Sequence, residues 1–205
     1  VQILNKIDDD FNELESGFEN IELQITDDEN NLYQIDTISA KKITSNLMLL
    51  NNLSVSQIVG EDNISAKADS GTFDDILNHL ILNDNIDINY FDYNLQTTQL
   101  VFEIKNSIVN FTNSVDIVSS SETIKALALN FDIKKQKLIS AHSLSYNNAD
   151  SNELLLADKI EIDQDNVNLF HGFNVEYQIN DVVISGQNFV FSISDTNEIS
   201  EINGS

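Results

Sequence analysis

Three histidines and 34 carboxylates are the side chains of this chain that could bind a metal ion or transfer protons. The histidines, His79, His142 and His171, lie far apart in the sequence and share no spacing typical of metal ligands. With so many carboxylates, two that lie close in the sequence are no evidence for the acid pair of a glycosidase. We therefore expect no metal site and no cofactor.

Acidic clusters occur at Asp8–Asp10, Asp27–Glu29 and Asp74–Asp75. They lack the glycine and the closing glutamate of a calcium loop, so we interpret them as solvated faces. No glycine-flanked nucleophilic serine and no glycine-rich phosphate loop is present, and six glycines could hardly supply one. The sequence thus contains no positive sign of catalysis, and we expect a protein that is not an enzyme.

The composition limits the partners. The formal charge is −24, every base is lysine, and cysteine and proline are absent. Nucleic acid is excluded because phosphate binding needs clustered positive charge. An anionic membrane surface would repel this body as a whole. Without cysteine there are no disulfides and no thiolate chemistry, whichever compartment holds the protein.

Apolar and polar residues alternate from Ile21 to about Asp195, as at Ile86 to Tyr90 and from Phe173 to Ile179. This period of two is typical of strands with one face on a core and one in water. Asn- and Asp-rich turns separate the strands, for example at Asn180-Asp181. The sequence therefore predicts an all-β chain.

A phrase in which an apolar residue lies two positions before a small one recurs about every thirty residues. The small residues are Ala40, Ala66, Thr97, Ala126, Ala157 and Gly186. Such a period is typical of a stacked array, here of two strands per unit. The small residues allow either tight packing between sheets or an apolar furrow wide enough for a guest chain, and both interpretations stay open.

The ends of such an array expose unpaired backbone groups that can pair with another chain. We expect one docking edge at Ile21–Thr26, with Ile21, Leu23 and Ile25. We expect the other at Val182–Ile193, with Val182, Ile184 and Val190. Residues 1–20 are interpreted as a linker or short helix, residues 21–195 as the β-domain, and residues 196–205 as a disordered tail.

The chain resembles the lipopolysaccharide-export periplasmic family, the OstA-like proteins. The resemblance rests on short phrases: Ile38-Ser39-Ala40-Lys41-Lys42 before a turn, Asn51-Asn52-Leu53 leading into the next strand, and Ile64-Ser65-Ala66-Lys67. It covers about Ile21 to Asp195 and favours the C component (LptC), with the bridging A component (LptA-like) as second choice. It departs from the family pattern at Leu95-Gln96-Thr97 and at Gly186-Gln187.

The resemblance implies a twisted, V-shaped β-jellyroll with an open apolar groove that holds lipopolysaccharide acyl chains. It implies a periplasmic protein, anchored to the inner membrane by an N-terminal helix that precedes Val1. The protein would pass lipid from the inner-membrane ABC transporter complex, at the Ile21 edge, to an LptA-like bridge protein, at the Val182 edge. The residues expected to line the groove are Ile35, Ile64, Ile86, Ile88, Phe102, Ile117, Phe173, Val175 and Tyr177.

Charge restricts how such a lipid could be held. Lipid A is anionic, so a body at −24 must bind it by burying acyl chains rather than by attracting its phosphates. Two other classes remain open: a structural or adhesin-like β-repeat module without a lipid ligand, and a carbohydrate-active β-helix enzyme.

Overall fold

A computed structural model describes residues 17–28, 30–59, 64–135, 137–163, 169–193 and 199–204. The chain divides into two compact units, Val1–Asn110 (unit 1) and Phe111–Ser205 (unit 2). Strands paired in antiparallel fashion make up most of the described residues, which confirms the predicted all-β class. The one helical element in the described ranges is a short 3-10 turn, η1 (Ile104–Asn106).

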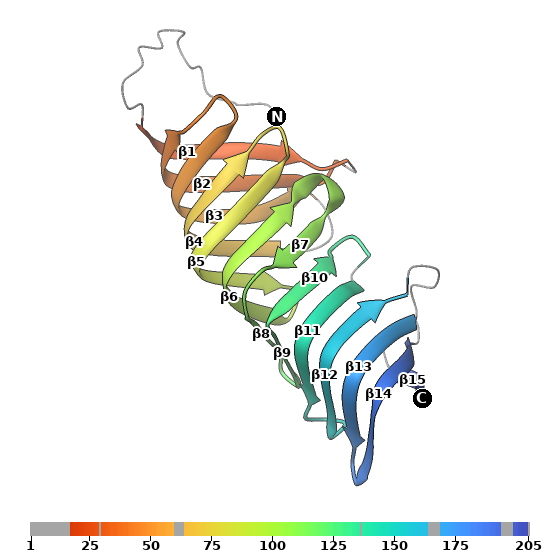
Figure 1. Cartoon of the computed structure of the whole chain (residues 1–205). Coiled ribbons are helices and arrows are strands. Elements are labelled where there is room, and N and C mark those ends of the chain that lie inside the picture. The colour runs from red at the N-terminus through yellow and green to blue at the C-terminus, as the bar shows by residue number, and fades with distance from the viewer. Residues whose placement is uncertain are drawn as a thin grey trace. The chain divides into compact units, whose positions relative to one another are not determined.

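Unit 1 is a meander in which each strand pairs with the strand that follows it in the chain (Figure 1). Its strands are β1 (Gly17–Thr26), β2 (Leu32–Lys42), β3 (Leu47–Val59), β4 (Ile64–Asp74), β5 (His79–Tyr90) and β6 (Tyr93–Glu103). A short strand, β7 (Ile108–Phe111), lies at the boundary between the units.

Unit 2 begins with three short strands, β8 (Val115–Val118), β9 (Glu122–Ala126) and β10 (Ala128–Asp132). Strand β8 pairs with β9, and both β9 and β10 pair with β11. A second meander follows, made of β11 (Lys137–Asn148), β12 (Glu153–Ile162), β13 (Leu169–Ile179), β14 (Val182–Ile193) and β15 (Ile199–Gly204).

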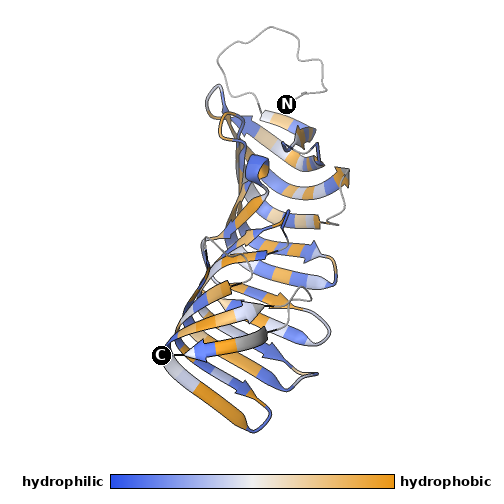
Figure 2. Cartoon of the chain, turned by 90° about the vertical axis from the view of Figure 1, so that its right-hand side faces the viewer, coloured by the Kyte–Doolittle hydropathy of each residue, from blue (hydrophilic) through white to orange (hydrophobic). Residues whose placement is uncertain are grey.

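The predicted alternation is present within these strands. In β5, Ile86 and Ile88 are buried while Asp87 and Asn89 are exposed. Figure 2 shows the resulting succession of hydrophobic and hydrophilic bands along the strands. Burial of every second side chain removes one face of each strand from water, and this is the main stabilising term of each unit.

The alternation changes phase near the middle of the long strands. Leu50 and Leu53 of β3 are both buried although they are three residues apart, as are Gly172 and Val175 of β13. Between them the chain turns at Asn52 and Asn174, whose φ angles of 50° and 49° are left-handed. Asparagine adopts this conformation more readily than most residues. The strand bends there, and its two halves bury side chains on the same face.

The strand pairing shows the same bend. The β1–β2 pairing skips from Glu19 to Ile21, and the β13–β14 pairing skips from Phe173 to Val175. Unpaired backbone at this level lets successive strands curve together, as each unit does in Figure 1.

Matching side-chain bonds join neighbouring strands at the bend in both units. The Nδ2 of Asn85 donates to the Oδ2 of Asp69 at 2.6 Å in unit 1. The Nδ2 of Asn174 donates to the Oδ2 of Asp158 at 2.7 Å in unit 2. Each is a charge-assisted hydrogen bond from the later strand to the earlier one, so it holds the two bends in register.

The expectation of solvated acidic clusters is wrong for Asp27, which is buried. Its carboxylate accepts hydrogen bonds from the backbone N–H and the Nδ2 of Asn31, at 2.9 and 2.7 Å, and closes the turn between β1 and β2. Asp74 plays a similar part, because its Oδ1 accepts from the backbone N–H groups of Ile76 and Leu77, both at 3.0 Å. Asp8–Asp10 and Glu29 lie outside the described residues.

Two predicted boundaries differ from the structure. Residues 17–20, expected in a linker, belong to β1, while residues 1–16 lie outside the described residues. The expected disordered tail is wrong for Ile199–Gly204, which form β15 and pair with β14. Strand formation there depends on a partner strand 6 to 15 residues earlier, from Ile193 opposite Ile199 to Phe189 opposite Gly204, which local composition does not reveal.

The recurring small residues do not line up as one row. Ala40 follows the bend of β2 and faces Leu50 of β3. Ala66 precedes the bend of β4 and faces Val55 and Ile88. The repeated phrase thus falls at different levels of β2 and β4, which β3 separates, so in unit 1 it does not mark a continuous strip of small side chains.

Candidate functional site

A row of apolar side chains crosses unit 1 on its buried face. The register places the following residues opposite one another on successive strands, and all are buried: Leu23, Ile35, Val55, Ala66, Ile88 and Leu95. Two of the predicted groove residues, Ile35 and Ile88, therefore share one row. This apolar face is the surface that could hold a fatty ligand.

The interior of unit 1 is bridged by aromatic rings. Tyr33 of β2 meets Phe102 of β6 edge to face, with ring centroids 5.2 Å apart and planes at 79°. These strands are not neighbours in the sheet, so the contact crosses the interior. A second contact crosses it where the Oγ of Ser107 donates to the Oδ2 of Asp27 at 3.2 Å. The buried side chains of unit 1 thus pack against one another.

Seven of the nine predicted groove residues are buried: Ile35, Ile86, Ile88, Phe102, Ile117, Val175 and Tyr177. Ile64 is half-buried. The structure brings Ile117 and Tyr177 into one row of unit 2, which runs through Ile124, Tyr146 and Leu155. In the described structure these side chains form packed interiors, which a guest chain could enter only if packed groups moved apart.

Phe173 does not join the other predicted groove residues. The bend at Asn174 changes the phase of β13, so Val175 is buried while Phe173 is 38% exposed. Its ring lies on the opposite face, with the Nζ of Lys159 5.9 Å from the ring centroid. The prediction for Phe173 is wrong because the alternation of buried and exposed side chains does not continue through Asn174, whose φ is positive.

Unit 2 contains two part-buried tyrosine–glutamate pairs that sequence reasoning missed. The hydroxyl of Tyr146 donates to Glu122 at 2.9 Å, and the hydroxyl of Tyr177 donates to Glu153 at 2.7 Å. Burial, together with the carboxylate acceptor, raises the pKa of Tyr146 to about 12. Burial and the bond to Glu153 raise the pKa of Tyr177 further. Both phenols therefore stay neutral and place a polar margin beside the apolar row.

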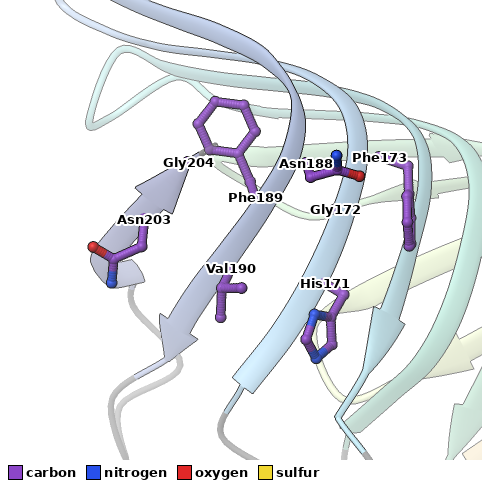
Figure 3. Close-up of a pocket in the computed structure, with 8 residues that line it drawn as sticks. All are labelled: His171, Gly172, Phe173, Asn188, Phe189, Val190, Asn203 and Gly204. Carbon is purple, nitrogen blue, oxygen red and sulfur yellow. The ribbon is translucent and has the colours of Figure 1, made fainter.

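Unit 2 has a hollow of about 270 Å³ over β13, β14 and β15 (Figure 3). It is lined by His171, Gly172, Phe173, Asn188, Phe189, Val190, Asn203 and Gly204. The second pocket, of about 490 Å³, is lined mainly by polar side chains of β9, β11, β12 and β13, among them Lys125 and Asn147. Of the predicted groove residues, only Phe173 lines either of these two hollows.

The expected transporter edge, β1, pairs with β2 and with no other described strand. Leu23 and Ile25 are buried and Ile21 is half-buried. These side chains already contribute to the core of unit 1. What β1 could offer a partner is its backbone, rather than the three side chains named from the sequence.

The expected bridge edge, β14, is open along only part of its length. Strand β15 pairs with β14 from Phe189 to Ile193, and Val190 lies opposite Asn203. Val190 is therefore not on an open edge, because the segment expected to be a disordered tail covers it. From Val182 to Asn188, β14 has β13 as its single described neighbour, and Val182, Val183 and Ile184 are 57%, 56% and 40% exposed.

The described residues contain no group of three or more histidine or acidic side chains placed to hold a metal ion. His171 instead makes a 2.7 Å contact between its Nε2 and the Oδ2 of Asp163. No helix in the described part of the chain has the length and apolar character needed to cross a membrane.

Comparison with protein-family models found no matching family, and a search of curated proteins found no match. The features of the candidate site are two apolar interiors, a polar margin in unit 2 and a partly open strand edge.

Proposed function

We propose that this protein is a periplasmic lipopolysaccharide transport protein of the OstA-like kind, with a twisted V-shaped β-jellyroll built from two-strand repeats of about thirty residues. Its function is to receive acyl chains in an apolar groove between the bent halves of its strands. The observation that carries the proposal is the apolar row that continues from strand to strand, of which Ile35 and Ile88 are members.

The net charge of −24 sets the mode of binding, because anionic phosphates must stay in water while the acyl chains are buried. At about 0.8 kcal/mol per methylene, one chain of about a dozen carbons contributes on the order of 10 kcal/mol before costs. Opening the interior at Tyr33 and Phe102 opposes this gain. Acyl burial is large enough to offset the loss of one aromatic pair, which is worth about 1 kcal/mol beyond its area.

Transfer from protein to protein would use the strand edges. The backbone of β1 (Ile21, Leu23 and Ile25) would meet the inner-membrane ABC transporter complex. The open part of β14, with Val182 and Ile184, would pair with a bridge protein that is LptA-like. The N-terminal anchor expected before Val1 would hold the protein at the inner membrane.

Photo-crosslinking to purified lipopolysaccharide tests the groove. A photo-reactive side chain at Ile88, in the buried row, should capture lipid, whereas one at Ile38, 60% exposed on β2, should not. Because substitution of Ile88 could disturb folding, unmodified protein is heated with and without lipopolysaccharide in parallel. Ligand at a hundred times its Kd should stabilise the fold by about 2.7 kcal/mol and raise the Tm by roughly 5–10 °C. Capture from Ile38 alone, or an unchanged Tm, would refute lipid burial.

A second candidate is a structural or adhesin-like β-repeat module without a lipid ligand. The burial of seven of the nine predicted groove residues favours it, since a filled interior needs no guest. The heating experiment separates the two candidates, because a purely structural module gains no stability from lipopolysaccharide.

A further inference from the structure

Three connections lie side by side along one margin of unit 1: residues 43–46 between β2 and β3, residues 75–78 between β4 and β5, and residues 104–107 after β6 (Figure 1). Backbone hydrogen bonds join them. Asp75 N–H donates to the carbonyl of Asn46 at 3.0 Å, and Ile104 N–H donates to the carbonyl of Asn78 at 3.0 Å. Together with the strand ends beside them, residues 41–42, 47, 74 and 103, the connections form one surface, here called the tip.

The tip exposes large aliphatic side chains. Ile43, Ile76 and Leu77 are 53%, 66% and 57% exposed, and Ile76 is the most exposed of the large apolar residues described. Their loops are held in shape. Asp74 accepts from the N–H groups of Ile76 and Leu77, and Thr44 Oγ1 accepts from the N–H of Leu47 at 3.1 Å. These apolar groups are thus presented to water by an ordered backbone, a costly arrangement unless something covers them.

The charge of the tip differs from that of the chain. Residues 41–47, 74–78 and 103–107 contain three lysines (Lys41, Lys42 and Lys105) and three acids (Asp74, Asp75 and Glu103), so their formal charge is zero. The whole chain carries −24, so that entire net charge belongs to residues outside the tip. The three lysines are exposed. An anionic surface, which repels the acidic remainder of the chain, would therefore tolerate contact with the tip, whose formal charge is zero.

We propose that the tip docks on a lipid bilayer, inserting Ile43, Ile76 and Leu77 shallowly at the boundary between headgroups and acyl chains. Exposed aliphatic residues beside lysines, whose stems reach back to the headgroups, are the composition of an interfacial contact. A protein partner is a poorer fit, because protein interfaces favour aromatic residues and arginine and disfavour lysine, and the tip has three lysines and no aromatic or arginine. Bilayer docking is independent of whether lipopolysaccharide enters the interior.

Vesicle flotation with the full chain tests the proposal. Phosphatidylcholine vesicles, which contain no lipopolysaccharide, should carry the wild-type protein. The double variant Ile76→Ser/Leu77→Ser should reduce the partition coefficient about tenfold, since two partly buried aliphatic side chains are lost. The matched control, Ile38→Ser/Leu127→Ser, removes two side chains that are 60% and 61% exposed and do not belong to the tip, and it should float like the wild type.

Partial replacement of phosphatidylcholine by phosphatidylglycerol should weaken flotation, because the acidic body is repelled from an anionic surface. Circular dichroism checks that every variant is folded. Failure of the wild type to float, or equal flotation of the tip variant and the wild type, would overturn the proposal. Equal losses in the tip and control variants would also overturn it, since they would show binding without a defined surface.

Discussion

The contact between Tyr33 and Phe102 decides whether the interior of unit 1 is packed in solution. The two rings belong to strands that are not neighbours, so their coupling reports the distance between β2 and β6. We expect the single variants Tyr33→Leu and Phe102→Leu each to destabilise the fold by about 1–3 kcal/mol, because both rings are buried.

The double variant isolates the contact itself. An edge-to-face pair at a centroid distance of 5.2 Å is expected to contribute about 0.5–1.5 kcal/mol beyond its buried area. The loss in the free energy of unfolding of the double variant should therefore be about 1 kcal/mol smaller than the sum of the losses of the two single variants. Other interactions that each ring makes cancel in the cycle, so this difference measures the pair.

Equilibrium urea denaturation, followed by far-ultraviolet circular dichroism, measures all four proteins. A difference of about 1 kcal/mol corresponds to roughly 2–4 °C in Tm for a chain of this size, so thermal melts give an independent check. Coupling indistinguishable from zero, below about 0.3 kcal/mol, would refute the packed interior. It would mean that the halves of unit 1 stand apart in solution, as an open groove requires.

Three further predictions concern the bend, the tyrosines and the open edge. Asn174→Val should destabilise the fold by about 1–3 kcal/mol in urea, because a β-branched residue resists φ of 49°, while Asn174→Gly should cost less; equal losses would argue against a strained bend. Since burial raises the pKa of Tyr146 and Tyr177 above the ordinary value of 10.0, their stabilising contribution should be complete below about pH 10. This contribution should be lost as the pH rises through about 12, so the Tm of the wild type should fall there. The double variant Tyr146→Phe/Tyr177→Phe should show a smaller fall in Tm; an equal fall would mean that the pKa values of the phenols are not raised. Ile184→Lys should leave the Tm nearly unchanged but abolish capture of an LptA-like bridge protein, whereas the control Val118→Lys, at a 45% exposed site on β8, should not; capture at wild-type strength would exclude this edge.

The sequence by itself determined the elements. Apolar side chains at every second position, as at Ile86 and Ile88, can leave water together only if the chain is extended, so the pattern predicts strands wherever it persists. Turn chemistry is equally local. Asn180 has a φ of 51° between β13 and β14, in the turn expected there, because asparagine tolerates left-handed backbone.

Only the tertiary structure decided which face each residue joins and which edges are open. One left-handed residue in mid-strand reverses the alternation of buried and exposed side chains in the rest of the strand. Phe173 and Val175 therefore lie on opposite faces, although their spacing of two is that of residues on one face of a regular strand. The pairing of Val190 with Asn203 and the meeting of Tyr33 with Phe102 join residues distant in the chain. Such contacts depend on how the strands bend and return, and no local pattern of hydrophobicity records that path.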